Sequence, residues 1–381
     1  MIYFDNAATS FPKPREVEAA MLQSLSRYGA NPGRSGHRLS LDTAIKIYEC
    51  RETAARFFGA AQPEHVVFTQ NCTHALNLAL KGFLQPGDHV ILSDLEHNSL
   101  LRPVHALSQQ GLITYSIAPV GENDTETIAA FAQLFRPETR LIACTHGSNV
   151  WGLSLPLQAL GALAHSHGAL LLTDCAQTAG VLPIDMARDN IDFLCTAGHK
   201  SLCGPTGTGL LITALGQQLR PLLEGGGTNS LELDQPDTMP ERLESGTINT
   251  MGIIGLQAGI KWVQRQGLNR LHNQEMELTR LIAYSLAHMK HIQLYTLPPD
   301  TDHHLPVLSF TMAGNPSEKV VNALSDRGFA LRGGLHCAPL AHRKMGTWQS
   351  GAARISVGAF NTRQQARQLC DAIAKLTRQA L

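Results

Sequence analysis

The middle of the chain alternates short apolar runs with longer amphipathic stretches. Six apolar runs are predicted to be buried strands: residues 89–94, 113–118, 140–146, 169–174, 191–197 and 208–213. Helical patterns lie between them, for example over residues 73–83 and 157–168. Nearly continuous apolar strands that alternate with helices are typical of a mostly parallel sheet covered on both faces.

Polar residues follow several of these predicted strands. They include Asp94, Asn149, Asp174 and the AGHK stretch that ends at Lys200. In open α/β sheets, ligands bind outside the carboxyl ends of the strands. The pattern therefore predicts a single crevice at that edge of the sheet.

The last third of the chain has a different pattern. Glycine-rich stretches at 225–230 and 244–250 come first. The helical patterns that follow are 252–266, 270–289, a stretch near 317–327 and one from about residue 362, and the apolar runs are 291–296, 305–312, 329–332 and 354–359. This order predicts a smaller α+β domain after the parallel sheet.

Composition narrows the class of protein. The 381 residues are 43% hydrophobic and 16% charged, which is typical of a globular chain, and the formal net charge is +0. A neutral chain gives no electrostatic reason to expect nucleic acid or an anionic membrane as a partner. We see no signal peptide and no apolar run long enough for a membrane span. The 8 cysteines form no CxxC pair, so we expect reduced thiols and a cytoplasmic protein.

Asp174 and Lys200 together suggest a specific chemistry. A buried lysine loses its proton more easily, and a neutral amine forms a Schiff base with an aldehyde. Pyridoxal phosphate (PLP) enzymes need such a lysine and an acid opposite the pyridine nitrogen. The alternatives are a helix cap for Asp174 and a phosphate-binding lysine for Lys200, although the GxxxxGK[ST] motif is absent.

Two further groups fit that chemistry. Thr73 opens a predicted helix, where backbone N–H groups bind phosphate, and His199 lies beside the lysine; simple capping is the alternative for Thr73. Cys337 lies in the Gly/Pro-rich stretch RGGLHCAPLAH, next to His336 and near Arg332. This setting favours a reactive thiolate over a structural thiol. The remaining histidines form only weak clusters, so we expect no metal site.

These residues lie in stretches that resemble one family over essentially the whole chain. The chain resembles the fold-type I, class V aminotransferase-like PLP enzymes, and among them the cysteine desulfurases and selenocysteine lyases. The stretches that carry the resemblance are YFDNAATSFPKP, NPGRSGH, LEHNS, SNVWG, TDCAQTAG, AGHKSLCGPTGTGLL, ESGTINT, GLHCAPL and RISVGAFNT. The resemblance implies a large PLP-binding domain over residues 16–255, built on a mostly parallel, seven-stranded sheet. It implies a small domain over residues 1–15 and 256–381 that carries Cys337.

The resemblance also implies how the cofactor is bound. Lys200 corresponds to the Schiff-base lysine, Asp174 to the partner of the pyridine nitrogen and Gln177 to the contact of the phenolic oxygen. His97 would stack on the ring and help to move protons. Thr73 and His199 would hold the phosphate, together with Thr247 from a second subunit, which implies an obligate homodimer. Ala197 stands where relatives carry a phosphate-binding serine, so we expect rearranged phosphate contacts.

The implied activity is that of a cysteine desulfurase, which converts L-cysteine to L-alanine. Asn149 and Arg354 would bind the substrate, and Asn149 would also contact the cofactor. His37 and Arg332 would line the entrance. Cys337 would accept the sulfur as a persulfide and could pass it to a protein acceptor. A selenocysteine lyase, an aminotransferase or epimerase that does not use Cys337, and a non-catalytic protein with this fold remain alternatives.

Overall fold

The computed structural model describes residues 1–33, 36–227, 233–295, 299 and 303–378, and all structural statements concern these residues. The α-helices are α1 (Arg15–Arg27), α2 (Arg38–Phe58), α3 (Cys72–Phe83), α4 (Asn98–Gln109), α5 (Asp124–Ala132), α6 (Leu157–Ser166), α7 (Thr250–Gln266), α8 (Leu268–Ala287), α9 (Ser317–Ser325), α10 (Pro339–Lys344) and α11 (Arg363–Arg378). The strands are β1 (Ile2–Tyr3), β2 (Val66–Thr69), β3 (His89–Ser93), β4 (Thr114–Ala118), β5 (Thr139–Thr145), β6 (Leu170–Asp174), β7 (Phe193–Ala197), β8 (Gly209–Ile212), β9 (Ile292–Leu294), β10 (Val307–Met312), β11 (Phe329–Ala330) and β12 (Ala353–Ser356).

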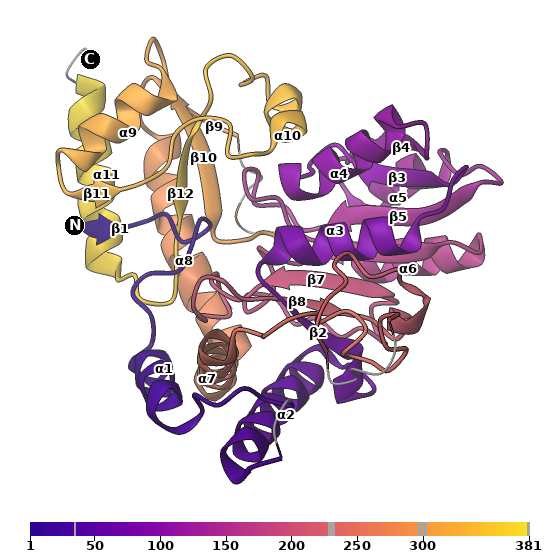
Figure 1. Cartoon of the computed structure of the whole chain (residues 1–381). Helices are drawn as coiled ribbons and strands as arrows, with labels where there is room; N and C mark the ends of the chain where they lie inside the picture. The colour runs from indigo at the N-terminus through magenta and orange to yellow at the C-terminus, as the bar shows by residue number, and fades with distance from the viewer. Residues whose placement is uncertain (34–35, 228–232, 296–298, 300–302, 379–381) are drawn as a thin grey trace.

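A seven-stranded sheet forms the centre of the larger part of the molecule (Figure 1). Its strand order is β2-β8-β7-β6-β5-β3-β4. Strands β4, β3, β5, β6 and β7 run parallel, and β8 pairs antiparallel with both of its neighbours. The predicted α/β class with a mostly parallel sheet is confirmed. The antiparallel direction of β8 was not predicted.

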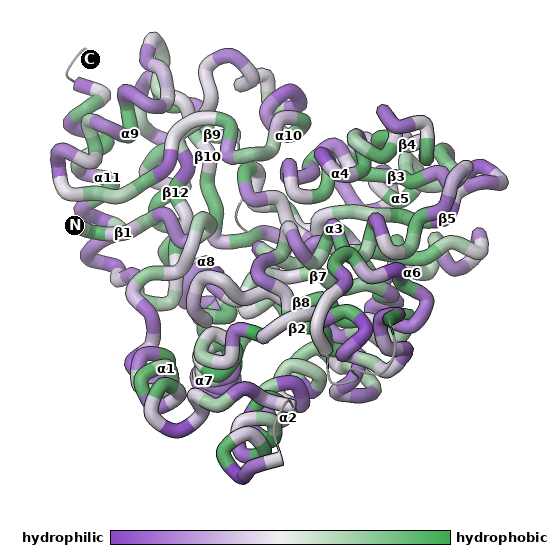
Figure 2. Tube along the Cα trace, in the orientation of Figure 1, coloured by the Kyte–Doolittle hydropathy of each residue, from purple (hydrophilic) through white to green (hydrophobic). Residues whose placement is uncertain are grey.

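Helices cover both faces of this sheet, which explains why its strands lack polar alternation. On β5, Leu141 and Ala143 pack in a core shared with α3 and α4, whereas Ile142 and Cys144 pack in a second core with α2, α6 and α7. Successive side chains of a strand point to opposite faces, so a strand buried on both faces needs an apolar residue at every position. In Figure 2 green predominates at β3 and β7.

The C-terminal part contains two smaller sheets. Strands β12, β10 and β9 form an antiparallel sheet in that order, and β1 from the N-terminus pairs in parallel with β11. A separate hydrophobic core joins these strands to α8, α9 and α11. Figure 1 shows the N-terminal strand lying among these C-terminal elements. The domain division at residue 255 stays a prediction, and α7 runs through that position.

The predicted strands of the last third are present with shorter bounds, whereas α7 begins two residues before its prediction and α8 is shifted by two residues. The predicted strand 354–359 is β12, which ends at Ser356, and the predicted helix near 317–327 is α9. The predicted strand 291–296 corresponds to β9, although residue 296 lies outside the described residues. Parts of the stretches 31–37 and 225–230 also lie outside them. None of the described helices combines the length and the apolar character that crossing a membrane requires.

Candidate active site

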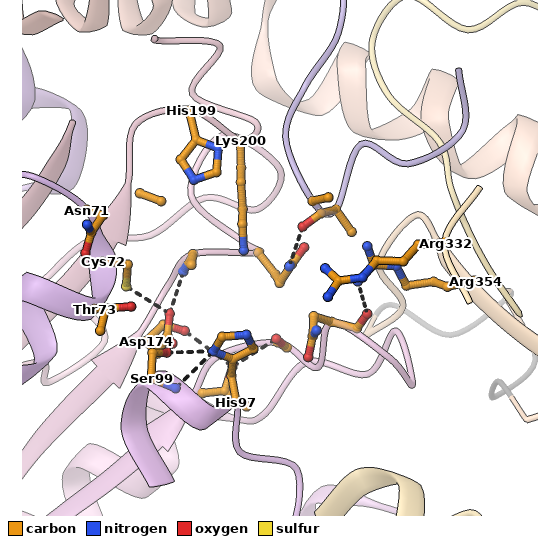
Figure 3. Close-up of a pocket in the computed structure, with 18 residues that line it drawn as sticks. Asn71, Cys72, Thr73, His97, Ser99, Asp174, His199, Lys200, Arg332 and Arg354 are labelled. Carbon is orange, nitrogen blue, oxygen red and sulfur yellow. Dashed lines mark hydrogen bonds between the residues drawn. The ribbon is translucent and has the colours of Figure 1, made fainter. Parts of the chain in front are cut away.

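A cavity of about 220 Å³ lies at the carboxyl ends of the central strands. Figure 3 shows the side chains around it. The seven-stranded sheet and its loops contribute most of the lining, and Arg332 and Arg354 reach it from the C-terminal part. Nine predicted site residues line this cavity: Thr73, His97, Asn149, Asp174, Gln177, His199, Lys200, Arg332 and Arg354. The predicted crevice therefore exists, but Asp94 does not line it. That part of the prediction is wrong, because Asp94 lies 2.7 Å from Lys344 of α10 in an ion pair instead.

Lys200 follows β7 in a tightly packed turn. A Cβ atom at Gly198 would lie 2.2 Å from Thr208 Oγ1, so only glycine fits there. Burial lowers the pKa of Lys200, whereas the nearby Asp174 carboxylate opposes that shift. The amine is thus closer to its neutral, nucleophilic form than a surface lysine.

Side chains of the N-terminal segment bind the backbone of this turn. These contacts were not predicted from the sequence. Ser10 Oγ donates to the Lys200 carbonyl at 2.8 Å. The His199 carbonyl accepts from Ser10 N at 3.1 Å and from Lys13 Nζ at 2.7 Å. Burial lowers the pKa of Lys13 to about 8. These bonds fix the peptide groups of the turn from which the Lys200 side chain extends.

Asp174 ends β6 with its carboxylate in the cavity and is 4% exposed. It accepts hydrogen bonds from Ala176 N at 2.9 Å, Cys72 Sγ at 3.3 Å and Ser99 Oγ at 3.4 Å. A charged carboxylate here can pair with a protonated ring nitrogen. Cys72 and Ser99 were not predicted from the sequence, because nothing in their spacing relates them to Asp174.

His97 caps the N-terminus of α4, and its Nδ1 accepts from Ser99 N at 3.1 Å. Burial lowers the pKa of His97 to about 4. The Asp174 carboxylate has the next largest effect and acts in the opposite direction. The ring is therefore neutral near pH 7.

The opposite end of the cavity suits an anion. Helix α3 begins there, with Asn71 Oδ1 accepting from His74 N at 2.9 Å. Among the described residues, the structure records no hydrogen-bond partner for the amides of Cys72 and Thr73 or for the buried Nδ1 of His199. These donors meet the needs of a phosphate group, so the site fits PLP at both ends. Ala197 lines the cavity, whereas Thr196 Oγ1 turns away to the Cys175 carbonyl, as its position on the strand predicts.

Arg354 is only 1% exposed. Its Nη2 pairs with Asp5 Oδ1 at 2.7 Å, and its Nη1 donates to the Asn149 carbonyl at 3.1 Å. Its Nε is buried and has no hydrogen-bond partner among the described residues. A buried guanidinium with an unused donor at a cavity can accept a carboxylate ligand. The pairing with Asp5 was not predicted.

Cys337 lies beside the cavity, 3.9 Å from Nη2 of Arg332. It is exposed, whereas the other seven cysteines are buried. Its carbonyl accepts from Asn98 N at 2.7 Å, and the carbonyl of His336 accepts from Asn149 Nδ2 at 2.8 Å. The loop that carries Cys337 is thus hydrogen-bonded to Asn98, which follows His97, and to the side chain of Asn149.

Besides Cys337, two predicted site residues, His37 and Thr247, do not line the cavity of this chain. His37 is exposed at the start of α2, where its Nδ1 accepts from Ser40 N at 3.2 Å. Thr247 lines a neighbouring hollow, and its Oγ1 accepts from Asn31 Nδ2 at 3.3 Å. Their roles at the entrance and at the phosphate stay predictions.

The model of the aminotransferase class-V family matches residues 2–369. The chain belongs to this family. It is 33% identical over 391 residues to a protein named cysteine desulfurase from Escherichia coli O127:H6, covering 99% of this chain and 94% of that protein. It is 31% identical over 384 residues to a probable cysteine desulfurase from Methanothermobacter thermautotrophicus, with 98% and 94% covered. The chain spans only 53% of the length of another relative, a probable cysteine desulfurase from Mycolicibacterium paratuberculosis.

Solved structures agree with these relatives. The apo cysteine desulfurase from Thermococcus onnurineus superposes with a TM-score of 0.91 at 32% identity, covering 99% of this chain and 94% of that one. The cysteine desulfurase CsdA from Escherichia coli gives 0.89 at 29% identity, with the same coverage. The family resemblance expected from the sequence is confirmed.

Proposed function

We propose that this protein is a PLP-dependent cysteine desulfurase that transfers the sulfur of L-cysteine to Cys337. One observation carries the proposal. Lys200 and Asp174 line the same cavity, and the exposed thiol of Cys337 lies next to Arg332 at its edge. The relatives named cysteine desulfurase support it. A buried lysine alone would fit many PLP enzymes, but the thiol next to Arg332 fits this activity specifically.

The chain's residues divide the work of holding the cofactor and substrate. The donors at the start of α3 and His199 would hold the phosphate, and the Asp174 carboxylate would pair with the ring nitrogen. When bound, PLP supplies an electron sink for charge that develops at the substrate α-carbon. Lys200 Nζ, with its lowered pKa, takes the α-proton. Arg354 would bind the substrate carboxylate through its unused Nε.

Sulfur transfer then involves the Cys337 thiolate. Its Sγ attacks the substrate sulfur and forms an S–S bond while the Cβ–S bond of the substrate breaks. The electron pair of that bond stays with the carbon, which takes up a proton and becomes the methyl group of alanine. Cys337 is left as a persulfide, in which the transferred sulfur is oxidised relative to the substrate thiol. Because the thiol is exposed, a protein acceptor could reach it.

We further propose that two copies of the chain form a dimer. Helices α1 and α2 expose apolar side chains, among them Leu22, Leu25, Leu39, Leu41 and Ile45, each more than half exposed. Both helices pack on α7, and several large apolar side chains exposed on two such helices are typical of an interface. Thr247 lies outside the cavity of its own chain, which is compatible with its donation to a second one.

A product assay tests the proposal. Wild type and Cys337→Ala would each receive L-cysteine, and alanine, sulfide and persulfide would be measured with a reductant present. We expect wild type to release alanine and sulfide in equal amounts and Cys337→Ala to release neither at a comparable rate. Unchanged sulfide release by Cys337→Ala would contradict the role of that thiol. The same assay with L-selenocysteine separates a desulfurase from a selenocysteine lyase.

A further inference from the structure

A hydrogen-bonded chain of three side chains lies beneath the exposed thiol of Cys337. His336 Nε2 lies 3.2 Å from the Arg332 carbonyl, and His336 Nδ1 lies 3.2 Å from His342 Nε2. His342 Nδ1 lies 2.7 Å from Thr347 Oγ1. All three residues are at most 2% exposed. We call His336, His342 and Thr347 the histidine chain.

The Arg332 carbonyl fixes the direction of these bonds. A carbonyl oxygen only accepts, so His336 Nε2 carries the proton and donates. Burial, and after it the Arg354 charge, lowers the pKa of His336 to about 2 and that of His342 to about 4. Both rings are therefore neutral. His336 Nδ1 must accept from His342 Nε2, and His342 Nδ1 must accept from the Thr347 hydroxyl.

The backbone above the histidine chain has an uncommon conformation. His336 and Cys337 have φ values of 49° and 58°, in the left-handed region that residues with a Cβ atom avoid. Contacts must therefore impose it. Asn149 Nδ2 and Asn98 N hold the two carbonyls from the side of the larger sheet. On the other side, the ring of His336 is held by the Arg332 carbonyl and by His342.

We propose that His342 is a positioning residue for the sulfur-accepting thiol. Its Nε2–H fixes the ring of His336, and the ring fixes the adjacent Cys337 at the mouth of the cavity. His342 does not line that cavity, so it acts only through His336. The inference rests on the proposed function, because it assigns Cys337 the transfer step. A thiol displaced by even about 1 Å from its line of attack transfers sulfur much more slowly.

Three substitutions of His342 distinguish a specific hydrogen-bond donor to His336 from a side chain that only fills the space. In His342→Gln the side-chain amide keeps an N–H group near the place of Nε2, within reach of His336. In His342→Asn the amide ends near the place of Nδ1 and can reach Thr347 but not His336. His342→Phe keeps the ring shape and removes both bonds. The Gln and Asn variants carry the same amide group and differ mainly in the length of the side chain.

The experiment is a single-turnover measurement on the holoenzyme with L-cysteine. The rate of persulfide formation on Cys337 is followed by mass spectrometry, and substrate binding by the change in the cofactor spectrum. We expect a roughly 10- to 100-fold slower transfer in His342→Asn and His342→Phe, with substrate binding unchanged. His342→Gln should keep most of the wild-type rate. Melting temperatures are measured for all variants so that transfer rates are compared among folded proteins.

Three outcomes would overturn the inference. They are equal losses in the Gln and Asn variants, a wild-type transfer rate in His342→Phe, and loss of substrate binding in step with loss of transfer. Cys337→Ala is measured alongside as a test of the proposed function itself. If Cys337→Ala still releases sulfide, the proposed function fails. If it is inactive while His342→Phe behaves as wild type, only the role of His342 fails.

Discussion

The two sides of the cavity are built in different ways. Asp174 ends one strand of the central sheet and Lys200 follows another. The sheet has buried cores on both faces, and side chains of the N-terminal segment bind the backbone of the Lys200 turn. Cys337 lies on an exposed loop of the C-terminal part, in a left-handed conformation held by a few hydrogen bonds. Lys200 and Asp174 are therefore held in place by the central sheet and the segments packed against it. The loop that carries the thiol is held by a few contacts, two of which come from the single side chains of Asn149 and His342.

The largest expected effect is on the sheet side. Lys200→Ala should lower alanine formation by roughly 10³-fold or more, because the substitution removes both the Schiff-base amine and the base. Borohydride reduction followed by mass spectrometry should find no cofactor attached to the chain. Lys81→Ala, at an exposed lysine of α3, is the control and should retain the adduct. A cofactor adduct in Lys200→Ala would show that another lysine binds the cofactor.

The ion pair between Asp5 and Arg354 links the N-terminal segment to β12. Asp5→Asn leaves the buried Arg354 charge without its partner, so we expect a loss of about 3 kcal/mol in the free energy of unfolding. Urea denaturation measures this loss. Asp237→Asn is the matched control, because Asp237 pairs with Arg242 at 2.8 Å but is 98% exposed, and it should change stability very little. Equal effects of the two substitutions would contradict the importance of burial at Arg354.

A smaller effect is expected where the Cys337 loop continues into α10. Lys344 pairs with Asp94 at 2.7 Å and lies over the ring of Trp151 at 5.1 Å. Lys344→Met should cost about 1 kcal/mol and increase hydrogen exchange in α10, while the cofactor adduct at Lys200 is retained. Lys46→Met, which breaks a surface pair within α2, is the control. Unchanged exchange in α10 would mean that the loop does not depend on this contact.

The sequence predicted the sheet side of the site better than the thiol side. Apolar strands followed by polar residues indicate where strand ends meet, and that pattern located Asp174 and Lys200 correctly. It failed for Asp94, because a position after a strand does not reveal whether a side chain meets the cavity or a lysine 250 residues away.

The contacts around Cys337 lie beyond what a pattern can indicate. The bond from Asn98 N to the Cys337 carbonyl, and the pairing of Arg354 with Asp5, join residues far apart in the chain. The left-handed φ of Cys337 was not predicted either, because the residue types around it do not require that conformation. Tertiary contacts impose it, and only the folded chain brings those contacts together.

The most direct test locates the transferred sulfur. After one turnover with L-cysteine in the absence of reductant, the protein is alkylated, digested and mapped by mass spectrometry. We expect one additional sulfur atom on the peptide that contains Cys337, and none on peptides that contain the buried cysteines. Alanine formation without additional sulfur on Cys337, or with the sulfur on another cysteine, would contradict it.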